Sequence, residues 1–399
     1  MKKEDTQEVR LPNGTGLSAK GHRPSGLLRK FLRSPWLWLL LLWPLGFGLI
    51  WLCREHPSWA EAYQRYVYRY VSLCCHTVTG WLPFSLAEFL LLALPIVALV
   101  YLIVCIIGII RRKGQRFFTL VMAILRPISV GGIVFLLFVT NCGLNYYCRS
   151  AAAQLDWTII EPTTDQLYEV CVYLADNASR CREHLPENAD GTLRTDWSAI
   201  AQHARDAVND LHQQYDIVPD GYSVPKSVLL SRGMSYLDIT GVYFPWTFEA
   251  NVNTDVPGFS VAFTACHELM HIRGFMHEED ANFLAYLACI GSQDETLQYA
   301  GYITALEYLN KYLRRADTQR YADCMAHLSD AVWRDLEAQS HYWTQFETPI
   351  AEVAVQVNDA YLKQNNQTSG VISYSKMAEL VITHYLRRSA SAVDSAAAP

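Results

Sequence analysis

Two histidines four positions apart carry the clearest chemistry in this sequence. They belong to the stretch His267-Glu268-Leu269-Met270-His271, which has the pattern H-E-x-x-H. Residues four apart on a helix share one face, so both imidazoles can bind one metal ion. Bound zinc lowers the pKa of water towards about 7, and a neighbouring carboxylate can then accept a proton from that water. The pattern therefore predicts a Zn²⁺ hydrolytic site with Glu268 as general base.

Two residues compete for the position of third ligand, because a catalytic zinc site normally has three protein ligands and one open position. With Gly274, His277 completes H-E-x-x-H-x-x-G-x-x-H, the metzincin pattern. Glu278 instead begins Glu278-x-x-Ala281-Asn282, which resembles the E-x-x-A-D element of gluzincins, with Asn282 in the position that supports the ligands. No Met-turn follows His277, so Glu278 is the favoured ligand and His277 the alternative.

The sequence around the motif predicts the elements that position it. Residues 258–266 are small and apolar, as expected at the start of a buried helix, and Gly274 can end that helix. A second apolar run, residues 283–290, predicts another helix with acidic residues in its first turn. Residues 223–253 contain short strand-like runs broken by glycine and proline, so a small β-sheet is expected before the motif helix.

Groups that bind substrate are expected near this sheet. In zincins, the edge strand of such a sheet pairs with extended substrate. We assign this role to residues 241–253, and the residues expected nearest to substrate are Tyr243, Phe244, Asn251 and Asn253. A side chain that stabilises the oxyanion is also expected. Spacing cannot choose among the candidates, which are His341, Tyr342, Tyr361, Tyr374 and His384.

Three runs of sequence carry a more specific resemblance. Residues 241–255, 263–268 and 278–289 resemble an uncharacterised family of bacterial membrane proteins, known only as a domain of unknown function within the zincin peptidase group. The resemblance extends from about residue 80 to residue 363. It implies a peptidase-like site in which Glu278 is the third ligand, because the family usually has an acidic residue there and no histidine at the position of His277. It implies no particular substrate.

Three apolar segments precede the motif domain. Residues 36–53, 86–110 and 127–147 are each long enough to cross a bilayer. Basic residues dominate the tail 1–35 and the loop 111–126, whereas the loop 54–85 is nearly balanced. The positive-inside rule then predicts a multi-pass protein of the cell membrane, with a cytoplasmic tail at residues 1–35 and an extracytoplasmic chain after residue 147.

The loop between the first two segments has two interpretations. Residues 59–81 mix tyrosine and tryptophan with arginine, which suits a helix in the headgroup region of the bilayer. Packing against the outer domain is equally expected, and both can hold together.

The expected fold class is three transmembrane helices followed by a mainly α-helical (α+β), zincin-like, extracytoplasmic domain at residues 148–388. A disordered tail is expected at residues 389–399, which are rich in alanine and serine. The motif begins 120 residues after residue 147 (267 minus 147), which argues against cleavage inside the bilayer. Cys266 and Cys289 flank it on apolar faces and are expected to be core residues.

These features predict a membrane-anchored zinc metallopeptidase with a peptide or protein substrate and the lipid bilayer as partners. The net charge of −6 argues against nucleic-acid binding. One alternative is a non-catalytic binding or assembly module on a zincin scaffold. Another is a zinc amide hydrolase that acts on a component of the cell envelope.

Overall fold

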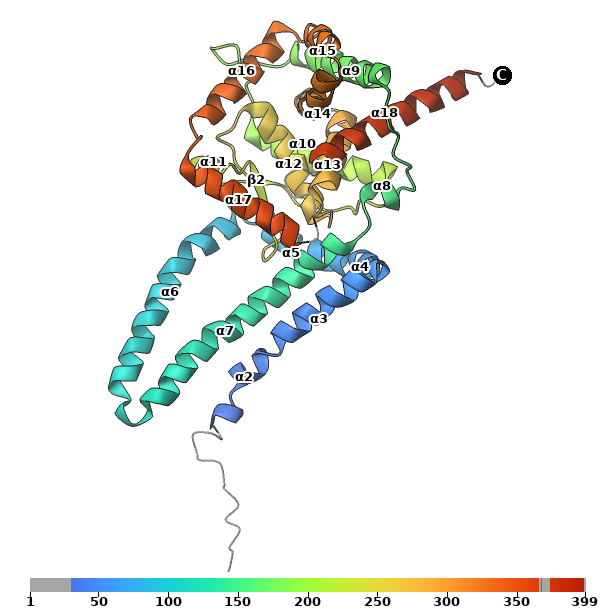
Figure 1. Cartoon of the computed structure of the whole chain (residues 1–399). Coiled ribbons are helices and arrows are strands. Elements are labelled where there is room, and N and C mark those ends of the chain that lie inside the picture. Colours follow the sequence, from blue (N-terminus) through green and yellow to red (C-terminus); the bar gives the residue numbers. More distant parts are fainter. Residues whose placement is uncertain (1–29, 366, 368–373, 398–399) are drawn as a thin grey trace, which may run out of the picture.

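The computed structural model describes residues 30–365, 367 and 374–397 (Figure 1). Most of the predicted cytoplasmic tail, residues 1–29, lies outside the described residues. Long helices extend from a mainly helical body, which holds a small three-stranded sheet. The predicted combination of three long apolar helices and a mostly helical domain with a small sheet is therefore confirmed.

Three helical segments are long and apolar enough to cross a membrane. They are α2 (Pro35–Leu39) with α3 (Leu42–Glu55), then α6 (Leu86–Arg111), then η2 (Lys113–Gln115) with α7 (Arg116–Asn141). Helix α7 lies between the other two. The Trp43 indole donates a hydrogen bond to the carbonyl oxygen of Ile128 at 3.1 Å, and the Tyr101 hydroxyl donates to that of Ala123 at 2.9 Å.

The third segment differs from its predicted bounds of 127–147. Helix α7 begins at Arg116 and ends at Asn141, and the short 3₁₀ helix η3 (Gly143–Tyr147) follows it. Pro127, at which the predicted segment starts, lies in the interior of α7, a position that apolar membrane helices tolerate better than soluble ones. Arg126 is consequently within the helix and not in a loop.

The connection between the first two segments is mostly helical and comprises α4 (Pro57–Tyr63), the π-helical η1 (Gln64–Tyr68) and α5 (Arg69–Thr79), followed by a non-helical stretch at residues 80–85. One face packs on the body: the hydroxyls of Tyr68 and Ser72 donate to the carbonyl oxygen of Ile272 at 3.1 and 2.9 Å. The other face is exposed and includes Trp59, Tyr66, Tyr70 and Val78. Packing against the domain is confirmed, and contact with headgroups stays a prediction.

Eleven helices of the described chain form the body. They are α8 (Ala151–Gln154), α9 (Thr164–Arg182), α10 (Trp197–Gln214), α11 (Ser231–Ser235), α12 (Gly258–Ile272), α13 (Glu278–Gly291), α14 (Glu295–Ala316), α15 (Thr318–Met325), α16 (Asp330–Thr344), α17 (Pro349–Gln364) and α18 (Tyr374–Ala397). Helices α12 and α13 form the centre and are buried along most of their length, including Cys266 and Cys289. This burial explains their apolar sequences, because α10, α14 and α18 pack against this pair of helices.

The C-terminal end differs from the expected disorder at 389–399. Helix α18 continues to Ala397, and residues 398–399 lie outside the described residues. Alanine has the highest helix propensity of all residues, so a run of alanine and serine can extend a helix that tertiary packing has already started.

The small sheet contains β1 (Lys226–Ser227), β2 (Gly241–Phe244) and β3 (Glu249–Val252) in the order β1-β3-β2. Strand β1 is parallel to β3, and β2 is antiparallel to it, with Gly241 opposite Val252. Strand β2 is therefore an edge strand, and it packs beside α12. The sheet precedes the motif helix in the chain, as predicted.

Hydrogen bonds connect this sheet to the second apolar helix. The buried Glu249 carboxylate accepts from the backbone N–H groups of Leu86 and Ala87 at 3.1 and 2.8 Å, where α6 begins. It also accepts from the Lys226 ammonium group at 2.5 Å. A carboxylate at a helix N-terminus satisfies backbone donors that have no partner within the helix. The end of α6 is thereby held on the body.

Candidate metal centre

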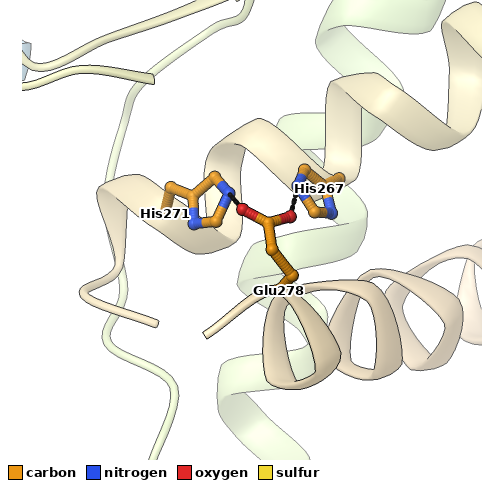
Figure 2. Close-up of side chains that lie close together, drawn as sticks. All are labelled: His267, His271 and Glu278. Atoms are coloured by element: carbon orange, nitrogen blue, oxygen red, sulfur yellow. Dashed lines mark ion pairs between the residues drawn. The ribbon is translucent and has the colours of Figure 1, made fainter. Parts of the chain in front are cut away.

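Three side chains from two neighbouring helices converge on one point (Figure 2). His267 and His271 lie on α12, and Glu278 is the first residue of α13. The Glu278 carboxylate oxygens lie 3.3 Å from Nε2 of His267 and 3.6 Å from Nε2 of His271. One donor atom from each of the three residues lies within 4.8 Å of the others, and burial is substantial at all three.

The short loop between the helices makes this convergence possible. Gly274 has φ of +97°, in the left-handed region that favours glycine. Its N–H donates to the carbonyl oxygen of His271, and the N–H of Phe275 donates to that of Met270. This pair of hydrogen bonds is a Schellman motif, which ends α12 at Ile272, one residue after His271, and reverses the direction of the chain. Glu278 is thus brought back beside the two histidines.

Neighbouring groups lie beside both imidazoles. Nδ1 of His271 lies 2.7 Å from the carbonyl oxygen of Phe275, so this nitrogen carries the proton and Nε2 keeps its lone pair. Asn282, one turn after Glu278, is buried beside His267. Nδ1 of His267 has no hydrogen-bond partner within the described residues. The structure therefore places Asn282 near the ligands, as the sequence predicted.

His277 does not join the group. It occupies the N-cap position of α13, and its ring packs edge-to-face on Tyr146 at 6.0 Å. Its ring also hydrogen-bonds to the backbone of Tyr146 and Cys148. Within the described residues, the group with metal-binding geometry is His267, His271 and Glu278. The geometry favours the gluzincin-like ligand set over the metzincin alternative.

The protonation states of Glu278 and His271 fit a divalent metal, whereas the pKa of His267 is raised because the adjacent Glu278 charge outweighs the effect of burial. Burial would raise the pKa of Glu278, but His271 and His267 outweigh this effect and lower it to about 2. Burial lowers the pKa of His271 to about 4. At neutral pH, the carboxylate is therefore charged and the imidazole neutral, as metal binding requires. Two imidazole nitrogens and one carboxylate oxygen are a donor set that zinc accepts.

The Glu268 carboxylate lies beside the three candidate ligands, and one of its oxygens makes no hydrogen bond. Its side chain is 3% exposed, and Oε2 has no hydrogen-bond partner. Burial raises its pKa to about 8, with a further increase from Glu278, while a hydrogen bond from the backbone of Tyr243 opposes this shift. An unpartnered buried carboxylate oxygen is costly to a fold. Its presence here is explained if the oxygen gains a partner when a second molecule binds.

Strand β2 passes directly against Glu268. A Cβ atom on Gly241 would lie 2.5 Å from Oε1 of Glu268 and 2.5 Å from Cγ2 of Thr264. Any other residue at this position would have to displace the strand or the carboxylate. Sequence reasoning did not identify Gly241, because the need for glycine comes from a contact between segments that only the fold brings together.

Tyr243 links the site to the third apolar helix. Its ring centroid lies 6.5 Å from that of His271. Its hydroxyl donates to the carbonyl oxygen of Asn141 at 3.0 Å and lies 3.2 Å from the hydroxyl of Tyr68. The metal centre is therefore close in space to the end of α7. The sequence did not indicate a role for Tyr68, because nothing in its local sequence distinguishes it from its neighbouring tyrosines.

The other predicted substrate residues lie in different surroundings. Phe244 packs against Trp246 at 4.9 Å, at the turn between β2 and β3. Asn251 is buried and donates to the carbonyl oxygens of Val242 and Glu249. Asn253 is fully buried and bonds to Ser235 and to the backbone of residues 239 and 255. These two asparagines hold the sheet and the following loop in shape.

One of the five oxyanion candidates lies near the ligands. Tyr361 on α17 is close enough to Glu278 for its pKa to be raised by that charge, after larger effects of burial and of Cys142. Its hydroxyl lies 3.4 Å from that of Tyr146. Three others are distant: Tyr342 bonds to Ser235 and Asp255, His384 stacks on Trp157, and His341 is exposed. The side chain of Tyr374 lies outside the described residues.

Comparison with known proteins places the chain in a family without assigning it an activity. No curated protein and no solved structure matches it. Residues 63–382 match a family described as "Protein of unknown function (DUF3810)". This match includes β2, β3, both ligand helices and α17, as well as the second and third apolar helices. The chain therefore belongs to the DUF3810 family.

Proposed function

We propose that this chain is a membrane-anchored zinc metallopeptidase with a gluzincin-like site on a zincin-like domain. The observation that carries the proposal is the convergence of His267, His271 and Glu278 beside the buried, unpartnered oxygen of Glu268. A buried carboxylate with one unpartnered oxygen has no evident structural role beside two histidines. It would have a clear role as a general base.

The chemistry follows from the positions of these residues. A zinc ion held by the three ligands would polarise a peptide carbonyl and acidify water. The positive charge of that ion would lower the pKa of Glu268 again. Its carboxylate would then accept the proton of the attacking water at Oε2 and deliver it to the leaving amine nitrogen. The backbone of Tyr243 lies beside Glu268 and opposes the rise in its pKa. Tyr361 is the group proposed to donate to the oxyanion.

Strand β2 is the proposed binding edge for substrate. It forms one side of the sheet and runs beside Glu268. An extended peptide can add to such an edge through main-chain hydrogen bonds, which places a backbone carbonyl near the metal without requiring a particular side chain. This arrangement favours a peptide substrate over a small non-peptide amide.

The proposed location is the cell membrane, with the domain outside the cytoplasm. Four basic residues remain at the turn between α6 and α7 after the bounds of α7 are corrected, namely Arg111, Arg112, Lys113 and Arg116. The N-terminal tail is also rich in lysine and arginine. By the positive-inside rule, both face the cytoplasm.

The test uses the full chain in lipid nanodiscs, with zinc content and cleavage of a peptide library measured in parallel. The wild type is expected to hold one zinc ion and to cleave, while Glu268→Gln holds zinc and loses cleavage by a factor of roughly 10³ or more, as for other essential catalytic groups. Equal cleavage by both proteins would show that Glu268 is not the base. Zinc without any cleavage by the wild type would favour a binding module, and absence of zinc would end the enzyme proposal.

A further inference from the structure

Helix α17 has an apolar face that no other part of the described chain covers. Of its 16 residues, only Leu362 is buried. Ile350, Val353 and Val357 are 60%, 59% and 64% exposed. Spacings of three and four residues place these side chains and Tyr361 on one face of the helix. The opposite face carries Glu352, Gln356 and Lys363, so α17 is amphipathic.

The uncovered face is turned towards the third apolar helix. The Tyr361 ring lies 6.3 Å from that of Phe138, which belongs to α7 and to the candidate span Lys113–Asn141. In Figure 1, α17 crosses the end of α7 that adjoins the body and does not run along that helix. Because Ile350, Val353 and Val357 share the face of Tyr361, they lie over the region where α7 would emerge from a bilayer.

The turn between β2 and β3 contacts α7 in the same region. The Trp246 indole N–H donates to the carbonyl oxygen of Val134 at 3.0 Å, and its ring lies 6.1 Å from that of Phe138. Val134 precedes Asn141, the end of α7, by about 10 Å along the helix axis. Part of the body therefore extends alongside the apolar segment. Tryptophan, with an apolar body and one polar N–H, is enriched at membrane interfaces.

We propose that α17 is an interfacial membrane helix. Its Ile350–Val353–Val357 face lies among the headgroups and upper acyl chains of the bilayer that α7 crosses, beside Trp246. Lipid is the occupant because this face is continuous, through Tyr361 and Phe138, with the surface of a span. A helix with charged residues opposite an apolar face binds bilayers in this orientation. The inference requires that α7 cross a bilayer, and it requires no enzymatic activity.

The test is photo-crosslinking to lipid from the full chain in nanodiscs of phosphatidylcholine and phosphatidylglycerol. A benzophenone amino acid replaces Val353 or Val357 in separate variants. Glu352 and Gln356, on the polar face of the same helix, provide matched controls. Leu94, an exposed residue within α6, provides the reference for full contact with acyl chains. Lipid adducts are measured by mass spectrometry of the peptides that carry the probe.

Adduct yields at positions 353 and 357 are expected to approach that at position 94 and to exceed those at 352 and 356 by roughly tenfold, since an interfacial helix buries only its apolar face in lipid. Equal yields on the two faces of α17, with strong labelling at position 94, would overturn the proposal. Crosslinks from 353 and 357 to another protein segment would also overturn it. If position 94 also gave no lipid adduct, the premise that these helices cross a bilayer would fail, and the proposal would fail with it.

Discussion

The hydroxyl of Tyr243 lies 3.0 Å from the carbonyl oxygen of Asn141, the last residue of α7. One side chain of the strand beside Glu268 is thus bonded to the end of an apolar helix. In sequence, the motif and that helix are more than a hundred residues apart, but the fold brings strand β2, which lies beside Glu268, to the end of α7. Cleavage outside the bilayer stays a prediction.

Metal binding should distinguish the two candidate third ligands. We expect Glu278→Ala to lose zinc, since only two ligands remain, and His277→Ala to keep it, since His277 is engaged with the backbone of residues 146 and 148. Asn282→Ala should weaken zinc binding by about 10–100-fold through loss of support for His267. Zinc competition with a chromophoric chelator measures all three. Retention of zinc by Glu278→Ala with loss in His277→Ala would reverse the assignment.

Gly241→Ala should impair catalysis more than metal binding. The added methyl group meets Oε1 of Glu268 and Cγ2 of Thr264 at 2.5 Å, so the carboxylate or the strand must move. Misplacement of a reacting group by about 1 Å costs on the order of 10²-fold in rate. We expect kcat to fall by about this factor while zinc stoichiometry stays at one. Gly233→Ala, where a Cβ finds its first neighbour only at 3.9 Å, is the matched control.

Tyr361→Phe tests the proposed oxyanion donor. Loss of such a donor lowers kcat by about 10²–10³-fold and leaves KM nearly unchanged. Tyr342→Phe removes a hydroxyl that bonds Ser235 and Asp255 away from the ligands and should have little effect on kcat. Steady-state kinetics on a peptide substrate measures both variants. A full-rate Tyr361→Phe enzyme would leave Tyr146, whose hydroxyl lies 3.4 Å away, as the donor to test next.

Breaking the buried ion pair that holds α6 on the sheet should destabilise the fold. The Lys226 ammonium group lies 2.5 Å from Glu249, and both side chains are buried. Removal of one partner leaves an uncompensated buried charge, so Lys226→Ala should cost about 3–5 kcal/mol. Lys363→Ala removes a solvent-exposed pair with Asp359 and should change stability by less than about 1 kcal/mol. Thermal unfolding in nanodiscs compares the two, and similar losses would contradict the argument.

Stability should fall in mild acid because of His384. Burial lowers its pKa to about 4 in the folded protein, against an ordinary value of 6.5. Between these values the unfolded chain binds more protons, so stability decreases as pH falls from about 6.5 to about 4, by up to roughly 3 kcal/mol. Denaturant unfolding at several pH values should show a smaller decrease for His384→Gln. The exposed His341→Gln serves as control, and an unchanged slope in both variants would exclude His384 as the cause.

The sequence predicted the parts of the site that depend on helical periodicity. His267, His271 and Asn282 could be placed because spacing along a helix determines which residues share a face. Spacing could not decide between His277 and Glu278, which are neighbours at the start of one helix. In the structure, the Schellman turn at Gly274 returns the chain so that Glu278, and not His277, lies beside the two histidines.

Contacts between distant segments could not be predicted in this way. Gly241, Tyr68 and Tyr361 come to the site from a strand, a π-helical turn and a late helix, and no local pattern connects them to the motif. The bounds of the third apolar helix were also not predicted: the predicted segment starts at residue 127, whereas α7 begins at Arg116 and holds Pro127 in its interior.

The hydrogen bond between Tyr243 and Asn141 also limits which bonds the proposed peptidase can reach. It ties the strand beside Glu268 to the end of α7. If α7 crosses a bilayer and the proposed activity holds, the site would stay at a nearly constant height above the lipid surface. A substrate anchored in the same bilayer would then be cleaved where its exposed segment reaches that height.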